Sequence, residues 1–164
     1  MEQLPFRAGA FDVVVTCWTL YFMNDIHAAL AEIRRCAAPG GRVVVATVAP
    51  DHMREYDELV ADAVRAVLGR SPEPDIGLRF DLETGEPYVR RAFEHVDLRE
   101  WRGSMDLPDV ETVLAIWHMY GPQLSDPEED VSVRAEFAAR AAVRIARDGA
   151  LHITRHDGAF VADL

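Results

Sequence analysis

The chain has 164 residues and a formal net charge of −11. Apolar residues make up 49% of it and charged residues 27%, which suits a globular protein with one domain of ordinary size. The acidic balance argues against binding to nucleic acid and to anionic membrane surfaces, and no apolar run has the roughly 18 residues of a membrane helix. We therefore expect a cytoplasmic protein that binds neither nucleic acid nor membranes.

Two short segments rich in β-branched residues predict the first strands. Residues 11–17 read FDVVVTC, and residues 41–48 read GRVVVATV. Both are almost continuously apolar, a pattern typical of strands that are covered on both faces in a parallel sheet. We therefore expect an α/β fold in which helices flank a parallel sheet.

The segment between these strands predicts a helix. Ile26, Leu30 and Ile33 recur at helical spacing, and Asn24 is the expected N-cap. The sequence PGG at 39–41 is expected to end the helix, because proline cannot continue it and glycine accepts a left-handed turn. Strand, helix and strand then form a βαβ unit.

The remaining elements are predicted by periodicity and capping signals. We expect a helix over 51–68, a short helix near 86–93 and a strand over 95–101. Asp109 and Asp126 are expected to cap two further helices.

The last residues, LHITRHDGAFVADL, predict two strands around Asp157-Gly158, a favoured hairpin turn. The expected organisation is one domain over 1–164, with a βαβ core at 1–50, a helical insertion at 103–148 and a closing hairpin at 149–164.

The chain has two cysteines. Cys17 ends the first predicted strand, and Cys36 lies near the end of the first helix. We interpret both as reduced, buried thiols of a cytoplasmic protein.

Several short motifs of the first 48 residues occur in a recognisable order. They are Leu4-Pro5-Phe6, Phe11-Asp12, Asp25, Ala29-Leu30, Glu32, Arg34-Arg35 and Pro39-Gly40-Gly41. In this order and spacing they resemble class I S-adenosylmethionine-dependent methyltransferases of the small-molecule type. The resemblance implies a Rossmann-like sheet with strand order three, two, one, four, five, seven, six, in which residues 11–17 are strand four and 41–48 strand five.

The resemblance also implies that part of such an enzyme is not contained in this sequence. The ten glycines form no GxGxG motif, and in the family that motif follows strand one. An Asp that contacts the adenine amine in family members would fall just before Met1. We therefore expect a truncated methyltransferase domain, made of the equivalents of strands four to seven, that binds S-adenosylmethionine weakly or not at all by itself.

The resemblance suggests which residues contact the cofactor. Glu2, Gln3 and Leu4 would flank the adenine. Cys17, Trp18 and Leu20 would line the methionine side.

The methyl acceptor is expected to be a small molecule. Tyr21, Trp117 and His118 are the candidate substrate contacts, and His118 or His52 could act as a general base. We expect no metal site, since His152 and His156 are about 13 Å apart if they lie four residues apart on one strand.

Two readings remain open for the whole chain. The first is a methyltransferase that is completed by further sequence or by another chain. The second is a non-catalytic methyltransferase-like module that binds or dimerises. In both, the Val-rich edge of strand 11–17 is expected to pair with another copy or a complementary chain, so we do not expect a stable monomer.

Overall fold

The computed structural model describes residues 3–72 and 79–164. One predicted cofactor contact, Glu2, lies outside this range. In chain order the elements are β1 (Phe11–Cys17), the 3₁₀-helix η1 (Leu20–Phe22), α1 (Ile26–Cys36), β2 (Ala37–Val48), α2 (Arg54–Leu68), α3 (Glu86–Ala92), β3 (His95–Leu107), α4 (Val110–Ala115), α5 (Trp117–Tyr120), α6 (Pro127–Asp148) and β4 (Leu151–Asp163). None of the helices in these ranges is both long enough and apolar enough to span a membrane.

The sheet has the strand order β1-β2-β4-β3. β1 is parallel to β2, and β4 is antiparallel to β2. Because β1 and β2 are the expected strands four and five, this order corresponds to four, five, seven, six. The predicted α/β fold with a partial Rossmann-like sheet is confirmed.

The chain divides into two compact units. Unit 1 comprises Met1–His52, Asp75–Arg102 and His156–Leu164, and unit 2 comprises Met53–Pro74 and Gly103–Arg155. β3 and β4 contribute residues to both units. The expected helical insertion at 103–148 lies in unit 2, which also contains α2.

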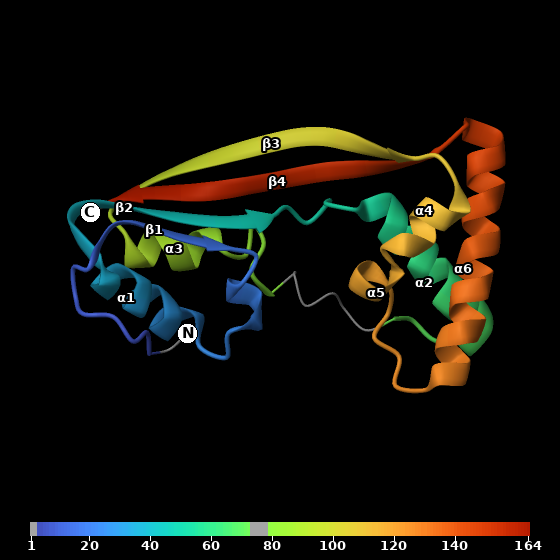
Figure 1. The fold of residues 1–164 in the computed structure, drawn as a ribbon, viewed down its shortest axis with the longest axis horizontal. Coiled ribbons are helices and arrows are strands. Elements are labelled where there is room, and N and C mark those ends of the chain that lie inside the picture. The colour runs from blue at the N-terminus through green and yellow to red at the C-terminus, as the bar shows by residue number, and fades with distance from the viewer. Residues whose placement is uncertain (1–2, 73–78) are drawn as a thin grey trace. The chain divides into compact units, whose positions relative to one another are not determined.

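Unit 1 has its core on one face of the sheet. Figure 1 shows α1 and α3 on the same side of β1 and β2. Val43 and Val45 of β2 and Phe160 of β4 are buried there together with Leu30 and Ile33 of α1. More buried and less buried residues alternate along much of β2, because successive side chains of a strand point to opposite faces.

Unit 2 has a separate core made by α2, α4, α5, α6 and the adjoining parts of β3 and β4. Tyr56 of α2 and Phe137 of α6 are fully buried, with ring centroids 4.9 Å apart. Asp109 and Asp126 cap α4 and α6 as predicted, since their carboxylates accept hydrogen bonds from the amides of Thr112 and Glu128.

Several expectations about the first βαβ unit are wrong in detail. The N-cap of α1 is Asp25 rather than Asn24, because the Asp25 carboxylate accepts the amide of Ala28 at 3.0 Å. The helix ends at Cys36, and residues 39–41 lie within β2, where the register against β1 shifts and Gly40 has the expected positive φ, 75°. Cys36 is buried as expected, but Cys17 is exposed, because among the residues that the structure describes β1 lies at the edge of the sheet and only one of its faces is covered.

The predicted hairpin at 149–164 is also wrong. β4 is one continuous strand, and Asp157 and Gly158 pair with Val48 and Thr47 of β2. A Cβ atom at Gly158 would lie 2.9 Å from the carbonyl oxygen of Arg99. The glycine therefore permits a close approach of β3 to β4, and the Asp-Gly pair is not a turn signal here.

Candidate functional site

The carboxyl end of β1 carries two exposed predicted cofactor contacts, Cys17 and Trp18. Trp18 has a positive φ of 50°, which a bulky side chain rarely adopts and which often marks a functional position. Its amide donates to the carbonyl of Ala46 in β2 at 3.0 Å, and this bond fixes the turn after the strand. The side chain remains 47% exposed. In open α/β sheets, ligands bind at the carboxyl ends of the strands.

The residues that follow contribute differently. Leu20 is buried in the core of unit 1, so its side chain supports the loop, and a contact with the cofactor stays a prediction. Tyr21 packs partly buried against the same core. Its ring centroid lies 4.5 Å from that of the exposed Phe22. Tyr21 therefore stays a candidate substrate contact.

Glu32 and Arg35 of α1 hold the segment that contains Leu4 by its backbone. The amide of Leu4 donates to Glu32 Oε2 at 3.0 Å, and Arg35 donates to the carbonyls of Leu4 and Phe6 at 3.2 and 2.8 Å. Glu32 and Arg35 also pair with each other at 2.7 Å. The hydrogen bonds from Arg35 and from the Leu4 amide lower the pKa of Glu32 to about 2.

In the sequence, Glu32 and Arg35 stand out only as parts of a family motif. Their spacing of three on one helix was the signal that both could reach the same segment. Gln3 is exposed and Leu4 half-buried beside this pair.

The two groups of predicted cofactor contacts are attached at different ends of β1. Phe6 contacts Phe11, the first residue of β1, with ring centroids 5.0 Å apart. Cys17 is the last residue of β1, and Trp18 follows it directly. The fit to a cofactor therefore rests on the exposed turn at Trp18, and the contacts predicted for Gln3 and Leu4 stay predictions.

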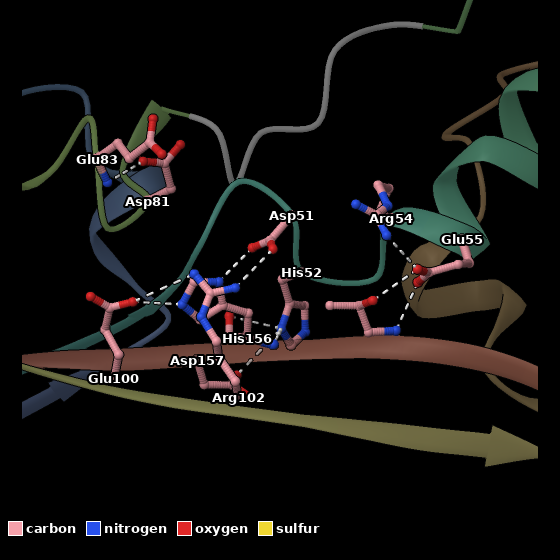
Figure 2. A network of polar contacts seen from close by, with 11 residues as sticks. Asp51, His52, Arg54, Glu55, Asp81, Glu83, Glu100, Arg102, His156 and Asp157 are labelled. Carbon is pink, nitrogen blue, oxygen red and sulfur yellow. Dashed lines mark hydrogen bonds and ion pairs between the residues drawn. The ribbon is translucent and has the colours of Figure 1, made fainter.

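A polar network follows the carboxyl end of β2 (Figure 2). The imidazole of His156 is almost completely buried; its Nδ1 lies 2.5 Å from an oxygen of Asp51, and its Nε2 lies 2.7 Å from an oxygen of Glu100. Arg102 donates to the other oxygen of Asp51 at 3.3 Å. The hydrogen bond from His156 lowers the pKa of Asp51 although partial burial raises it. The sequence does not predict this network, because its members are distant in the chain.

His52, one of the two candidate bases, lies beside this network. Its side chain is buried, and Nδ1 lies 3.3 Å from the backbone nitrogen of His156 and 3.6 Å from an oxygen of Asp157. Contacts with residues of β4 therefore hold the His52 ring in place. A role as a base stays a prediction.

Unit 2 contains the other two candidate substrate contacts. Trp117 is buried against Phe137, with ring centroids 4.9 Å apart, and its indole nitrogen donates to Asp130 at 3.2 Å. It is thus a core residue of unit 2. His118 on the same helix is exposed, so of these two residues His118 is the one that solvent or a ligand can reach.

Unit 1 also has an open pocket near the start of α1. Its lining includes Asn24, Asp25, His27, Arg79 and Tyr88. Arg79 donates to the carbonyl of Met23 at 3.1 Å. Within residues 3–72 and 79–164, no group of three or more His, Cys, Asp or Glu side chains has the arrangement of a metal site.

Comparison with known proteins agrees with this architecture. Residues 1–45 match the model of a family described as a methyltransferase domain. A malonyl-[acyl-carrier protein] O-methyltransferase of Chlorobium luteolum is 31% identical over 114 residues, which are 70% of this chain and 38% of that protein. A ubiquinone/menaquinone biosynthesis C-methyltransferase of Burkholderia vietnamiensis is 54% identical over 44 residues, which are 27% of this chain and 18% of that protein.

Solved structures with the same fold include a putative methyltransferase from an antibiotic biosynthesis pathway of Anabaena variabilis. It has a TM-score of 0.57 and 13% identity, over 99% of this chain and 70% of that one. A putative methyltransferase of Bacillus halodurans has a TM-score of 0.54 and 12% identity, over 99% of this chain and 73% of that one.

These matches and the strand order define a class I methyltransferase fold. The chain belongs to the S-adenosylmethionine-dependent methyltransferases, and its family match lies within unit 1. The chain spans less than two fifths of the length of the two curated relatives named above.

Proposed function

We propose that this chain takes part in S-adenosylmethionine-dependent methyl transfer to a small molecule. The observation that carries the proposal is the exposed, strained turn at Trp18, at the carboxyl end of β1 within the family-matched residues. A bulky residue is held in a left-handed conformation there by a hydrogen bond to β2. Such strain persists where the surrounding structure enforces it and is common at ligand sites.

The bound cofactor supplies an activated methyl group, so the protein mainly has to orient the two reactants. We assign Cys17 and Trp18 to one wall of the cofactor site. Glu32 and Arg35 position the segment around Leu4, which the family resemblance places near the adenine.

We propose the acceptor only as a small molecule, without naming the acceptor atom. The names of the relatives specify oxygen in one case and carbon in the other, so they do not fix the acceptor atom. Asp51 and His52 follow the carboxyl end of β2, and this placement supports a role on the acceptor side. His52 and His118 stay the candidate bases.

The cofactor assignment can be tested with S-adenosylhomocysteine, the stable product of the cofactor. Ligand-detected NMR with the full chain should show weak binding, and Trp18→Ala should weaken it by roughly tenfold, as expected when an aromatic contact is removed. The matched control is Trp101→Ala, since Trp101 is an exposed tryptophan of β3 that is 59% accessible. Equal loss in both variants, or no loss in Trp18→Ala, would contradict the assignment.

A further inference from the structure

The ring of His156 lies between two carboxylates (Figure 2). Its Nδ1 is 2.5 Å from an oxygen of Asp51, its Nε2 is 2.7 Å from an oxygen of Glu100, and only 5% of the side chain is exposed. An ionised carboxylate can only accept hydrogen bonds, whereas a neutral imidazole has one N–H group and one lone pair. A neutral ring would therefore turn its lone pair toward one of the two carboxylates, and only the doubly protonated imidazolium donates to both.

The alternative is a neutral carboxylic acid that donates a hydrogen bond to the ring, and it is disfavoured at both carboxyl groups. Asp51 also accepts a hydrogen bond from Arg102 at 3.3 Å, and the hydrogen bond with His156 lowers the pKa of Asp51. Glu100 is 43% exposed and lies 3.9 Å from Arg102, so water and a guanidinium both stabilise its ionised form. The additional proton therefore belongs on the ring of His156.

The other charged and titratable groups around His156 are consistent with a charged ring. Arg102 opposes a positive ring, but its side chain is 67% exposed, and it contacts the same two carboxylates. His52 approaches the backbone of His156, with its Nδ1 3.3 Å from the backbone nitrogen. Asp157 lies 3.6 Å from His52 and adds a further negative charge. Because opposite charges at hydrogen-bond distance favour the charged form of a group, the two direct carboxylate contacts outweigh the solvated guanidinium.

The charged ring joins three segments of unit 1. Asp51 follows β2, Glu100 belongs to β3 and His156 belongs to β4. The amide of Ala49 donates to the carbonyl of His156 at 3.0 Å, and after it the Asp51 side chain connects the chain to β3 through the ring and through Arg102. If the ring loses one proton, its contact with one of the two carboxylates becomes repulsive, and the connection between the segment after β2 and β3 weakens.

We propose that the His156 imidazolium is a pH-sensitive latch that holds the segment of Asp51 and His52 in place and releases it when the ring loses a proton. The latch is closed while the ring is charged and both carboxylates are ionised, so it weakens as the pH rises and the ring becomes neutral. Ligands bind beyond the carboxyl ends of strands in such sheets, so the latch acts on a segment at the ligand-binding end of β2. It depends only on contacts within unit 1 and does not rest on the proposed function.

Nitrogen-15 NMR of the histidine rings in the full chain tests the charge of His156. We expect both ring nitrogens to carry protons at about pH 7.5, where an exposed histidine is mostly neutral. Glu100→Gln should leave one ring proton at this pH, because a side-chain amide can donate to the lone pair of a neutral ring. Asp97→Asn is the matched control, since it removes a charge from the same strand at a side chain that is 75% exposed and pairs with Arg99. A single ring proton in the unchanged protein, or the same result in both variants, would overturn the proposal.

A pH titration of the backbone amide signals, without cofactor or acceptor, tests the release. The signals of Asp51 and His52 should move in the same pH range in which the His156 ring loses its proton. In Glu100→Gln both changes should occur about one pH unit lower, because one of two stabilising charges has been removed, and Asp97→Asn should leave them in place. Signals of Asp51 and His52 that stay constant while the ring loses its proton would show that the ring does not hold this segment. Because no ligand is added, this result is independent of whether the chain binds S-adenosylmethionine.

Discussion

The two units of the molecule differ in whether their sequence matches the methyltransferase family model. Unit 1 contains all 45 residues that match the methyltransferase family and the parallel pair β1 and β2. Unit 2 lies outside this match and is built mainly from helices, with a core of its own around Tyr56 and Phe137. The family motifs thus cover β1, α1 and most of β2, whereas the helical unit is held together by ordinary amphipathic packing.

The largest expected effects come from removing one large side chain from each core. Phe160→Ala in β4 and Phe137→Ala in α6 should each cost about 3–5 kcal/mol of unfolding free energy, because both side chains are fully buried. If the two cores are separate, each substitution should speed amide hydrogen exchange mainly in its own unit. Each variant is the control for the other, and equal loss of protection in both units would show that they unfold together.

The buried imidazole of unit 1 predicts the next largest effect. His156→Ala removes the partner of both Asp51 and Glu100, which should cost about 1–3 kcal/mol, the usual loss when buried polar groups lose their hydrogen bonds. Chemical denaturation would measure the change. His152→Ala is the control on the same strand, since His152 pairs with Asp106 at an exposed position and surface ion pairs contribute little. A similar loss of unfolding free energy in both variants would contradict the idea that the burial of His156 makes its hydrogen bonds important.

Unit 2 should become less stable at acidic pH because Glu55 becomes protonated. Burial raises the pKa of Glu55, but hydrogen bonds from the amide and hydroxyl of Thr154 outweigh it and lower the pKa from 4.5 to about 2. Because the pKa is lower in the folded state, this stability is present above pH 4.5 and is lost as the pH falls toward 2.

Glu55→Gln should therefore flatten the fall in melting temperature between these pH values. Glu58→Gln on the same helix is the control, because the Glu58 carboxylate is exposed and lies 4.0 Å from Arg144. An unchanged pH dependence in Glu55→Gln would show that the bonds to Thr154 do not govern the acid response.

The smallest expected effect is local and lies in unit 1. Glu32→Gln weakens the acceptor for the Leu4 amide, so exchange of that amide should accelerate by roughly tenfold while the core of unit 1 keeps its protection. Glu111→Gln is a suitable control, since Glu111 is an exposed residue of α4 in unit 2. Slow exchange at Leu4 in the Glu32→Gln variant would mean that Arg35 alone holds the segment.

Sequence patterns predicted much of the fold because local signals and tertiary structure agree there. The bounds of β1, the position of α3 and the caps at Asp109 and Asp126 were predicted from strand propensity and capping chemistry. The strand order followed from the family resemblance and is confirmed.

The errors occur where a tertiary contact decides the conformation. Gly158 and Gly41 looked like turn residues, but both allow close approach of neighbouring backbone within the sheet, to Arg99 and to Asp12 respectively. Asp25 rather than Asn24 caps α1, a one-residue difference that propensity does not resolve.

The candidate site was predictable only in part. The exposed turn at Trp18 follows a strand that the sequence marks clearly. The network of His156 with Asp51 and Glu100 joins residues more than 50 positions apart, and no local pattern predicts such pairs. Trp117 looked like an aromatic substrate contact, but periodicity cannot distinguish a pocket residue from the core residue that the structure shows.

We have proposed that unit 1 carries one wall of the cofactor site. Amide chemical shifts of the isotopically labelled full chain, recorded during titration with S-adenosylhomocysteine, test it residue by residue. We expect shifts that are largest at Cys17 and Trp18 and decrease away from the carboxyl end of β1. Saturable shifts confined to unit 2, or no shift at Trp18 at any ligand concentration, would contradict it.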